Sequence, residues 1–451
     1  NGDGFDDVII GSAYSDAGDL NSGESYVVFG KSGGFASAMK LSSLNGSNGF
    51  RLDGIDADDR SGRSVSSAGD VNGDGFDDLI IGAYLADSES SESGESYVMF
   101  GKSSGFASAL DLSSLDGNNG FRIDGIGLED RFGYSVKDVG DINGDGFEDL
   151  MIGAFEHNRL SADSGKSYVV FGKSGGFASV LELSTLDGSN GFRIDGDDRI
   201  NFSGISSVGG AGDVNGDGFD DLILGARWAE SGSKFSGESY LILGKSGGFS
   251  SALNVSSLNG SNGFQIAGVD ANDYSGSSVS GAGDVNGDGF DDLIISAVGG
   301  DAGGDFSGES YVVFGGNFTG RAETQIGGGT ASSLTAVNGA ARDVLIGGGG
   351  NDILISDGGP DVLIGGEGND ILAIPDANFS STRRIVGGTG TNTLRLDGSG
   401  ISLDLTTIRD NRIQSINVID IVGNGANTLT LNKQEVLNIS SHSNTLIVRR
   451  G

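Results

Sequence analysis

A run of acidic and amide side chains at alternating positions recurs five times in the first two thirds of the chain. The second copy shows the run in full: Asp70, Asn72 and Asp74 alternate with other residues, and Asp78 closes a nine-residue loop. Each of these side chains offers oxygen atoms, and Phe76 at the seventh position can add its backbone carbonyl. Oxygen donors at positions 1, 3, 5, 7 and 9, with glycine at position 6, can wrap a hard cation such as Ca²⁺. The pattern therefore predicts a cation site in each loop.

The same loop returns at spacings of 71 or 72 residues. The predicted ligands are Asn1, Asp3, Phe5 and Asp7; Asp70, Asn72, Asp74, Phe76 and Asp78; Asp141, Asn143, Asp145, Phe147 and Asp149; Asp213, Asn215, Asp217, Phe219 and Asp221; and Asp284, Asn286, Asp288, Phe290 and Asp292. Two carboxylates ~5 Å apart repel by about 3 kcal/mol at an effective dielectric of ~20, and a bound cation removes that repulsion. All-oxygen ligation in a flexible loop favours Ca²⁺ over Mg²⁺, so we expect about five Ca²⁺ ions here. The alternative is an acidic turn whose Asx side chains only cap the backbone.

A second acidic pattern follows nearer the C-terminus, with a period of nine residues. Its aspartates are Asp343, Asp352, Asp361 and Asp370, and each is followed by an apolar pair such as Val344-Leu345. The segment is rich in glycine, so a flexible linker is the alternative interpretation. The regular apolar pairs favour an ordered repeat.

Four short strands in each unit of the first array must position the loops. In the second unit we expect them at Ser64 to Ala68, Leu79 to Ala83, Ser96 to Phe100 and Gly120 to Gly125, separated by Gly, Ser and Asn clusters that supply turns. A continuous apolar run such as residues 79–81 is typical of a strand packed on both faces. Four strands per repeat, set side by side, are typical of a β-propeller blade.

Composition excludes several classes of protein. The 451 residues include 84 glycines but only two prolines, which fits neither a helical protein nor collagen. The formal net charge of −36 argues against binding to nucleic acid or anionic lipid. Cysteine is absent and histidine occurs twice, so disulfides, thiolate sites and multi-histidine sites are excluded. We expect no transmembrane segment, because no apolar run approaches 18 residues.

The first array resembles FG-GAP repeats, the blades of integrin α-subunit propellers and of many bacterial surface proteins. Phe132-Gly133 matches the Phe-Gly pair of that family, and Gly82-Ala83 and Gly153-Ala154 match its Gly-Ala pair, whereas Tyr84 stands where the family has proline. The resemblance covers residues 1 to about 315 and implies a calcium-stiffened propeller. It does not imply the ligand binding of integrins.

The nine-residue period resembles the RTX nonapeptide GGxGxDxLx, the parallel β-roll of proteins exported by type I secretion. The runs that start at Gly347 and Gly365 match it fully. In such a roll, turns 18 residues apart stack, which would pair Asp343 with Asp361 and Asp352 with Asp370 and hold up to about two Ca²⁺ ions. N-T-L triplets at Asn392, Asn427 and Asn444 resemble decayed turns of the same kind.

We therefore expect an all-β chain with four parts: a propeller segment at 1–315, a linker at 316–337, an RTX-like β-roll at 338–372 and a β-rich, solenoid-like module at 373–451. The first loop begins at its third position, so we expect either further blades upstream or completion of the propeller by another chain.

The expected function is that of a secreted calcium-binding structural or adhesive protein of a cell-surface layer, extracellular fibre or matrix, and not of an enzyme. Its expected partners are other surface or matrix proteins or further copies of itself. Two alternatives stay open. One is a lectin-like propeller that binds glycans, for which Arg227-Trp228 is the candidate sugar-stacking pair. The other is the non-catalytic part of a larger exported hydrolase.

Overall fold

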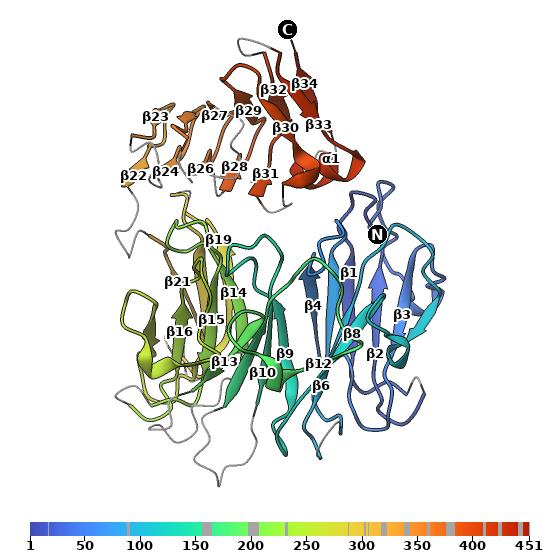
Figure 1. Cartoon of the computed structure of the whole chain (residues 1–451). Helices are drawn as coiled ribbons and strands as arrows, with labels where there is room; N and C mark the ends of the chain where they lie inside the picture. Colours follow the sequence, from blue (N-terminus) through green and yellow to red (C-terminus); the bar gives the residue numbers. More distant parts are fainter. Residues whose placement is uncertain are drawn as a thin grey trace.

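The computed structural model describes residues 1–16, 18–87, 91–155, 165–196, 207–230, 233–286, 288–301, 304, 306–316, 323–337, 343–358, 361–375, 384–408, 412–422, 426–440 and 445–450. Strands dominate these residues, as the sequence predicts. Those up to Val313 form five sheets set side by side as propeller blades, and the strands within each blade are antiparallel. The remaining strands form a parallel β-roll that lies over one end of the blades (Figure 1). The all-β prediction of a propeller followed by a β-roll is confirmed.

The five blades take their strands in chain order. Blade 1 contains β1 (Val8–Ser12), β2 (Glu24–Val28) and β3 (Gly49–Asp53). Blade 2 contains β4 (Ser64–Gly69), β5 (Asp78–Ala83), β6 (Glu95–Met99) and β8 (Gly120–Asp124). Blade 3 contains β9 (Phe132–Asp138), β10 (Leu150–Ala154), β11 (Lys166–Val170) and β13 (Gly191–Asp195). Blade 4 contains β14 (Ser207–Gly212), β15 (Asp221–Ala226), β16 (Glu238–Ile242) and β18 (Gly263–Ala267), and blade 5 contains β19 (Ser275–Gly283), β20 (Asp292–Ala297) and β21 (Glu309–Val313).

In blades 2 to 4 the second strand forms the middle of the apolar core. In blade 2, Ile81 of β5 lies opposite Val65 of β4 and Tyr97 of β6, and both Ile80 and Ile81 are fully buried. Successive side chains of a strand point to opposite faces, so burial of both means that the blade is packed on both sides. The four strands predicted for this unit are confirmed.

A further short strand, which the sequence analysis did not predict, joins neighbouring blades. The strands β7 (Ala109–Asp111), β12 (Val180–Glu182) and β17 (Ala252–Asn254) each pair in parallel with the outer strand of the preceding blade. Just before β7, the ring of Phe106 stacks on Phe50 of blade 1 with centroids 4.7 Å apart. Two later pairs of blades repeat this stacking at 4.3 and 4.4 Å. The glycine-rich connection therefore fastens each of these blades to its neighbour.

Two parallel sheets face each other in the roll. One contains β22 (Glu323–Ile326), β24 (Asp343–Ile346), β26 (Val362–Ile364), β28 (Arg384–Val386) and β31 (Ile413–Gln414). The other contains β23 (Ser333–Thr335), β25 (Ile353–Ile355), β27 (Ile371–Ile374), β29 (Thr393–Leu396), β32 (Val418–Asp420) and β34 (Ile447–Arg449). Buried leucines and isoleucines of both sheets, among them Leu345, Leu354, Leu363 and Leu372, form one continuous core.

The last part of the chain adds a two-stranded sheet and a helix. The sheet pairs β30 (Ser402–Asp404) with β33 (Thr428–Thr430), and α1 (Lys433–Ser440) follows it. Short 3-10 turns occur at Leu41–Ser43, Leu112–Ser114, Leu183–Thr185, Val255–Ser257 and Leu405–Thr407. The described residues from 373 onward therefore continue the roll, and α1 is an element that the sequence analysis did not anticipate.

The prediction of a linker at 316–337 is wrong for most of its described residues. Ile326 pairs with Ile346, and Leu334 pairs with Leu354 and packs against the roll core. The glycines between these strands form a turn like those of the later coils: the amide of Gly349 donates to the carbonyl of Gly328 over 2.8 Å. The glycine-rich composition is therefore that of a coil turn. Residues 317–322 and 338–342, at the predicted domain boundaries, lie outside the described residues.

The roll packs directly on the loops of the propeller. Phe290 of the fifth loop is buried in a small apolar cluster with Val344, Ile346 and Val362 of the roll. Beside this cluster, the guanidinium of Arg384 lies 3.4 Å from a carboxylate oxygen of Asp220. The predicted cation sites of the propeller are therefore partly covered by the domain that carries the second group of predicted sites.

Candidate metal centres

Loops 2 to 5 each join the first and second strands of their blade. Loop 2 (70–78) lies between β4 and β5, and loops 3 (141–149), 4 (213–221) and 5 (284–292) take the same place in blades 3 to 5. Loop 1 (1–7) precedes β1. All predicted ligands of the five loops lie among the described residues, although Gly287 of loop 5 does not.

The first aspartate of each complete loop bends the loop around its own carboxylate. In loop 4, Asp213 Oδ1 accepts a hydrogen bond from the amide of Asp217 at 2.8 Å, and Oδ2 accepts one from Gly218 at 2.7 Å. Asp70, Asp141 and Asp284 accept the corresponding bonds in their loops. Each oxygen keeps a second lone pair, so these bonds shape the loop and leave acceptor capacity for a cation.

The closing aspartate ties the loop to the third strand of its blade. Asp221 Oδ2 accepts from the amide of Val214 at 3.0 Å, and Oδ1 accepts from Gly244 at 2.8 Å. Gly244 opens a recurrent Gly-Lys-Ser sequence whose glycine makes the same bond in the other blades (Gly30, Gly101 and Gly172), as does Gly315 in blade 5. A side chain at Gly244 would meet the carbonyl of Asp220 at 2.2 Å. This glycine therefore anchors the loop.

Burial makes the ionised loop carboxylates unfavourable without a counter-charge. Burial, followed by the charge of Asp145, raises the pKa of Asp141 to about 6. Burial also raises the pKa of Asp78 to about 9, with Asp70 and Asp74 adding to the rise. In loop 4, burial likewise raises the pKa of Asp213 and of Asp221, and the nearby Asn215 Oδ1 is buried and has no hydrogen-bond partner. Buried anions beside an unsatisfied amide oxygen fit a hard divalent cation, so the donor set suits Ca²⁺.

The side chain at the seventh position locks neighbouring loops together. The ring of Phe219 lies over Gly144 of the preceding loop, where an added Cβ would meet it at 2.2 Å. Gly144 also has a φ of +71°, which L side chains rarely adopt. Phe76, Phe147 and Phe290 cover the equivalent glycines of the preceding loops. The phenylalanine thus links the blades, while its carbonyl is the predicted ligand.

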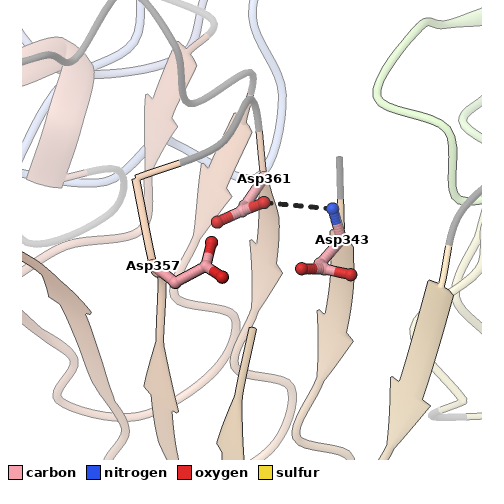
Figure 2. Close-up of side chains that lie close together, drawn as sticks. All are labelled: Asp343, Asp357 and Asp361. Carbon is pink, nitrogen blue, oxygen red and sulfur yellow. Dashed lines mark hydrogen bonds between the residues drawn. The ribbon is translucent and has the colours of Figure 1, made fainter. Parts of the chain in front are cut away.

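One acidic cluster in the roll brings three carboxylates close together. Asp343, Asp357 and Asp361 each have an oxygen within 4.8 Å of the others, and Figure 2 shows them gathered beside β24 and β26. The amide of Asp343 donates to Asp361 Oδ1 over 3.0 Å, as the 18-residue stacking predicts. Among the described residues this is the one group at that spacing, so the three carboxylates of a propeller loop are farther apart than these.

The sequence analysis missed Asp357. It stands where the RTX pattern has the second glycine of its leading pair, so the departure from the pattern was the available signal. Ser356 Oγ donates to Asp361 Oδ2 at 2.6 Å, which orients that carboxylate beside Asp357. The cluster is therefore richer in charge than the two aspartates predicted.

The other predicted pair of the roll is fully buried. The amide of Asp352 donates to Asp370 Oδ1 over 2.8 Å, again with the predicted spacing of 18 residues. The second carboxylate oxygen of each aspartate is buried without a hydrogen-bond partner. Such orphaned anionic oxygens fit a bound cation. That any of these residues binds Ca²⁺ stays a prediction.

Comparison with known protein families supports both resemblances. The family model of the FG-GAP repeat matches residues 61–99, 132–170, 206–242 and 275–313. The model of the RTX calcium-binding nonapeptide repeat (4 copies) matches residues 337–372. The chain therefore carries FG-GAP repeats followed by RTX calcium-binding repeats, and these are families of repeats rather than of enzymes.

Integrin α-subunits are among the similar proteins. The chain is 34% identical to integrin alpha-5 of Xenopus laevis over 170 residues, which is 37% of this chain and 14% of that protein. It is 33% identical to integrin alpha-PS5 of Drosophila melanogaster over 181 residues, 39% of this chain and 16% of that protein. The chain thus spans about a seventh of the length of these relatives. No helix among the described residues is long and apolar enough to cross a membrane.

Proposed function

We propose that this chain is a calcium-binding structural and adhesive module of an extracellular layer, fibre or matrix, exported by type I secretion and without catalytic activity. The phenylalanine of each of loops 2 to 5 contacts the loop of the preceding blade. A cation in each loop would therefore stiffen the contacts between blades as well as the blades themselves. The calcium-binding repeats in the roll and the integrin-like repeats in the propeller support an extracellular, adhesive role.

The observation that carries the proposal is a pair of exposed apolar faces on the two end blades. On blade 1, Val8 is 54% exposed and Ile10 is 39% exposed, although their equivalents in blade 3, Leu150 and Ile152, are buried. On blade 5, Val312 is 46% exposed and Phe314 is 56% exposed. The equivalents of these two residues in blade 2, Val98 and Phe100, are buried. We refer to Val8 and Ile10 as the leading face and to Ile294, Val312 and Phe314 as the trailing face.

The two faces are complementary halves of one kind of interface. Between blades 2 and 3, Ile80, Val98 and Phe100 pack against Leu150 and Ile152 in a single core. The trailing face can therefore receive a blade of a second copy that presents apolar residues as Leu150 and Ile152 do, in the way that blade 2 receives blade 3. Such a head-to-tail contact produces a ring or a filament, depending on whether the rotation closes. Exposed apolar patches of this kind mark interaction surfaces.

The test is the association of the purified chain in calcium, followed by sedimentation velocity over a range of concentrations. We expect association that Phe314→Lys weakens by at least about tenfold, which corresponds to roughly 1.4 kcal/mol. Leu128→Lys is the matched control, because Leu128 is equally apolar and exposed but lies outside both faces. A chain that stays monomeric at every concentration contradicts the proposal, as does equal weakening by the control.

A second candidate function, glycan binding, is favoured by a row of aromatic rings. The row runs from Tyr84 through Tyr134 and Phe155 to Trp228, with neighbouring centroids 5.6, 4.9 and 5.4 Å apart. Arg227 lies 4.0 Å over the ring of Trp228, and Arg63 lies 5.0 Å from that of Tyr134. Tyr84 follows the end of β5 opposite its acidic loop, so the row lies away from the predicted cation sites.

Tyr84 and Phe155 are buried, so Tyr134 and Trp228 are the rings that a ligand could contact. Half-buried rings beside guanidinium groups suit a ligand that carries both a flat apolar face and an anion, such as an acidic sugar. A glycan array probed in calcium tests this candidate. Trp228→Ala should abolish any signal, whereas Phe35→Ala should not. Phe35 is also paired with a cation, Lys31, but is remote from the row in sequence and lies in blade 1. An array without any bound glycan contradicts the candidate.

A further inference from the structure

Four side chains form a ladder along one edge of the roll, and they change from carboxylates to amides part of the way along. Asp352, Asp370, Asn392 and Asn417 occupy equivalent places in successive coils. Oδ1 of each of the last three accepts the backbone amide of the residue before it: Asp370 from Asp352 at 2.8 Å, Asn392 from Asp370 at 3.0 Å and Asn417 from Asn392 at 2.9 Å. Oδ1 of Asp352 accepts the amide of Ser332 in the same way. The first atom of these side chains therefore has the same role in every coil.

The second atom of the side chain differs between the two halves of the ladder. In Asp352 and Asp370 it is a buried oxygen without a hydrogen-bond partner. In Asn392 it is Nδ2, which donates to the carbonyls of Gly388 at 3.1 Å and Ser415 at 3.2 Å. The orphaned oxygens of the earlier coils are thus replaced by a donor with two partners.

The surroundings show that these atoms occupy the same place. A Cβ added to Gly347 would lie 2.7 Å from Asp352 Oδ2, and a Cβ added to Gly365 would lie 2.5 Å from Asp370 Oδ2. A Cβ added to Gly387 would lie 2.6 Å from Asn392 Nδ2. One coil earlier, Gly366 takes the place of Gly388, and Gly387 takes the place of Ser415. Their carbonyls are therefore the equivalents of the two that Asn392 contacts.

From this register we infer that Asp370 Oδ2 faces the carbonyls of Gly366 and Gly387, of which that of Gly366 also accepts the amide of Thr389 over 2.9 Å. An ionised carboxylate oxygen that faces two carbonyls has no donor to satisfy it, and only a cation or a proton can do so. Around Asn392 the amide group supplies two N–H donors to the same pair of carbonyls. The amide nitrogen thus provides the positive partner that the aspartate coils lack.

We propose that the Asn392 amide takes the place of a bound cation, so that the roll is divided into a calcium-dependent part and a calcium-independent part. The coils up to Asp370 need Ca²⁺ to become ordered, whereas the coils from Asn392 onward are ordered without it and provide a folded edge on which the earlier coils assemble. This rests on the calcium binding proposed above for Asp352 and Asp370.

Asn427 shows the same use of an amide in the third sheet of the roll. Its Oδ1 accepts the amide of Ile401 at 2.8 Å, and its Nδ2 donates to the carbonyls of Gly398 and Ile421 at 3.2 and 3.3 Å. A second asparagine therefore satisfies two carbonyls in a turn after the boundary. The calcium-independent support extends beyond a single residue.

Hydrogen exchange of the whole chain, measured by mass spectrometry with Ca²⁺ and with excess EGTA, tests the boundary. In EGTA we expect the amides of β25 and β27 to exchange at least about tenfold faster, while those of β29 and β32 change by less than about twofold. Equal loss of protection in all four strands overturns this inference but leaves calcium binding intact. If the exchange rates of the β25 and β27 amides are the same in EGTA as in Ca²⁺, the proposal that the roll binds calcium is overturned as well.

Two reciprocal variants sharpen the test. Asn392→Asp should make protection of β29 depend on Ca²⁺ and should add one bound ion, whereas Asp370→Asn should preserve protection of β27 in EGTA. Asn369→Asp is the matched control, because it adds the same charge to an exposed neighbouring side chain. If Asn392→Asp does not fold, Asp370→Asn still decides the question. Loss of β27 protection in EGTA in that variant overturns the inference.

Discussion

Asp220 accepts a hydrogen bond from the backbone amide of Asp141, the residue that begins the acidic loop of the preceding blade, over 2.9 Å. Asp291 accepts the same bond from Asp213 at 2.8 Å. Both acceptors occupy the eighth position of their loops, next to a closing aspartate at the ninth. The two adjacent acids that end these loops therefore have different roles. The aspartate at position 9 accepts a hydrogen bond from its own loop, whereas the aspartate at position 8 accepts one from the loop of the preceding blade. Stabilising one loop should thus help to stabilise its neighbour.

Removal of calcium should lower the melting temperature of the chain strongly. If each loop binds with a Kd near 10⁻⁴ M, about 1 mM Ca²⁺ adds roughly 1.4 kcal/mol per site. Five such loops would add roughly 7 kcal/mol, which is comparable with the whole stability of a typical domain. Thermal unfolding followed by circular dichroism, in calcium and in excess EGTA, measures the effect, and Mg²⁺ should restore only part of it. An unchanged melt in EGTA would show that the loops do not hold a stabilising cation.

Loss of one closing ligand should have a local effect. Asp221→Ala removes the acceptor of the amides of Val214 and Gly244 and leaves Asp213 without its closing partner. We expect one fewer bound Ca²⁺ by titration calorimetry and a destabilised fourth blade, with ions still bound in the other loops. Asp187→Ala is the control, since it removes the same charge from an exposed turn. An unaltered stoichiometry in Asp221→Ala would remove loop 4 from the set of sites.

Stability should depend on pH in opposite directions with and without calcium. Burial raises the pKa of Asp59 to about 7 and that of Asp141 to about 6, both above the value near 4 of an unfolded chain. The calcium-free folded state therefore binds more protons than the unfolded state between about pH 4 and 7, so its stability should rise as the pH falls through that window. With calcium, protons compete for the ligands and stability should fall instead.

Melting temperatures between pH 8 and pH 5, in EGTA and in saturating Ca²⁺, check the two slopes. Asp59 lies outside the acidic loops and should take up its proton on folding under both conditions, so Asp59→Asn should reduce the rise in EGTA and steepen the fall in calcium by a similar amount. Slopes of the same sign under both conditions would mean that the loop carboxylates do not exchange protons for a cation.

Much of the fold could be predicted because the repeats report the same strand pattern several times. The strands of blade 2 and the stacking of Asp352 on Asp370 follow directly from periodicity. The joining strand β7 could not be predicted, because three residues paired with another blade leave no local pattern. The role of Asp220 was also hidden, since it depends on the position of loop 3. Asp357 was missed because it departs from the motif that identified its neighbours.

Replacement of Arg384 should separate the roll from the propeller. Burial lowers the pKa of Arg384, but the carboxylates of Asp220, Asp213 and Asp291 outweigh burial and raise it above its usual range. This arginine is thus the cation from β28 that faces an acidic end of the propeller. Without it, the neighbouring carboxylates of Asp213, Asp220 and Asp291 on the propeller side lose this counter-charge, and we expect Arg384→Gln to lower the calcium-free stability by roughly 2–4 kcal/mol.

Two measurements distinguish this electrostatic role from simple packing. In scanning calorimetry the roll and the propeller of Arg384→Gln should unfold in separate transitions, whereas Arg395→Gln, which breaks the exposed pair with Asp397, should cost less than about 1 kcal/mol. Loop 4 should bind Ca²⁺ more tightly in Arg384→Gln, because a positive charge near Asp213 has been removed and no longer opposes the ion. A variant that keeps a single transition and an unchanged calcium affinity would show that the contact between Arg384 and Asp220 contributes little to joining the two domains.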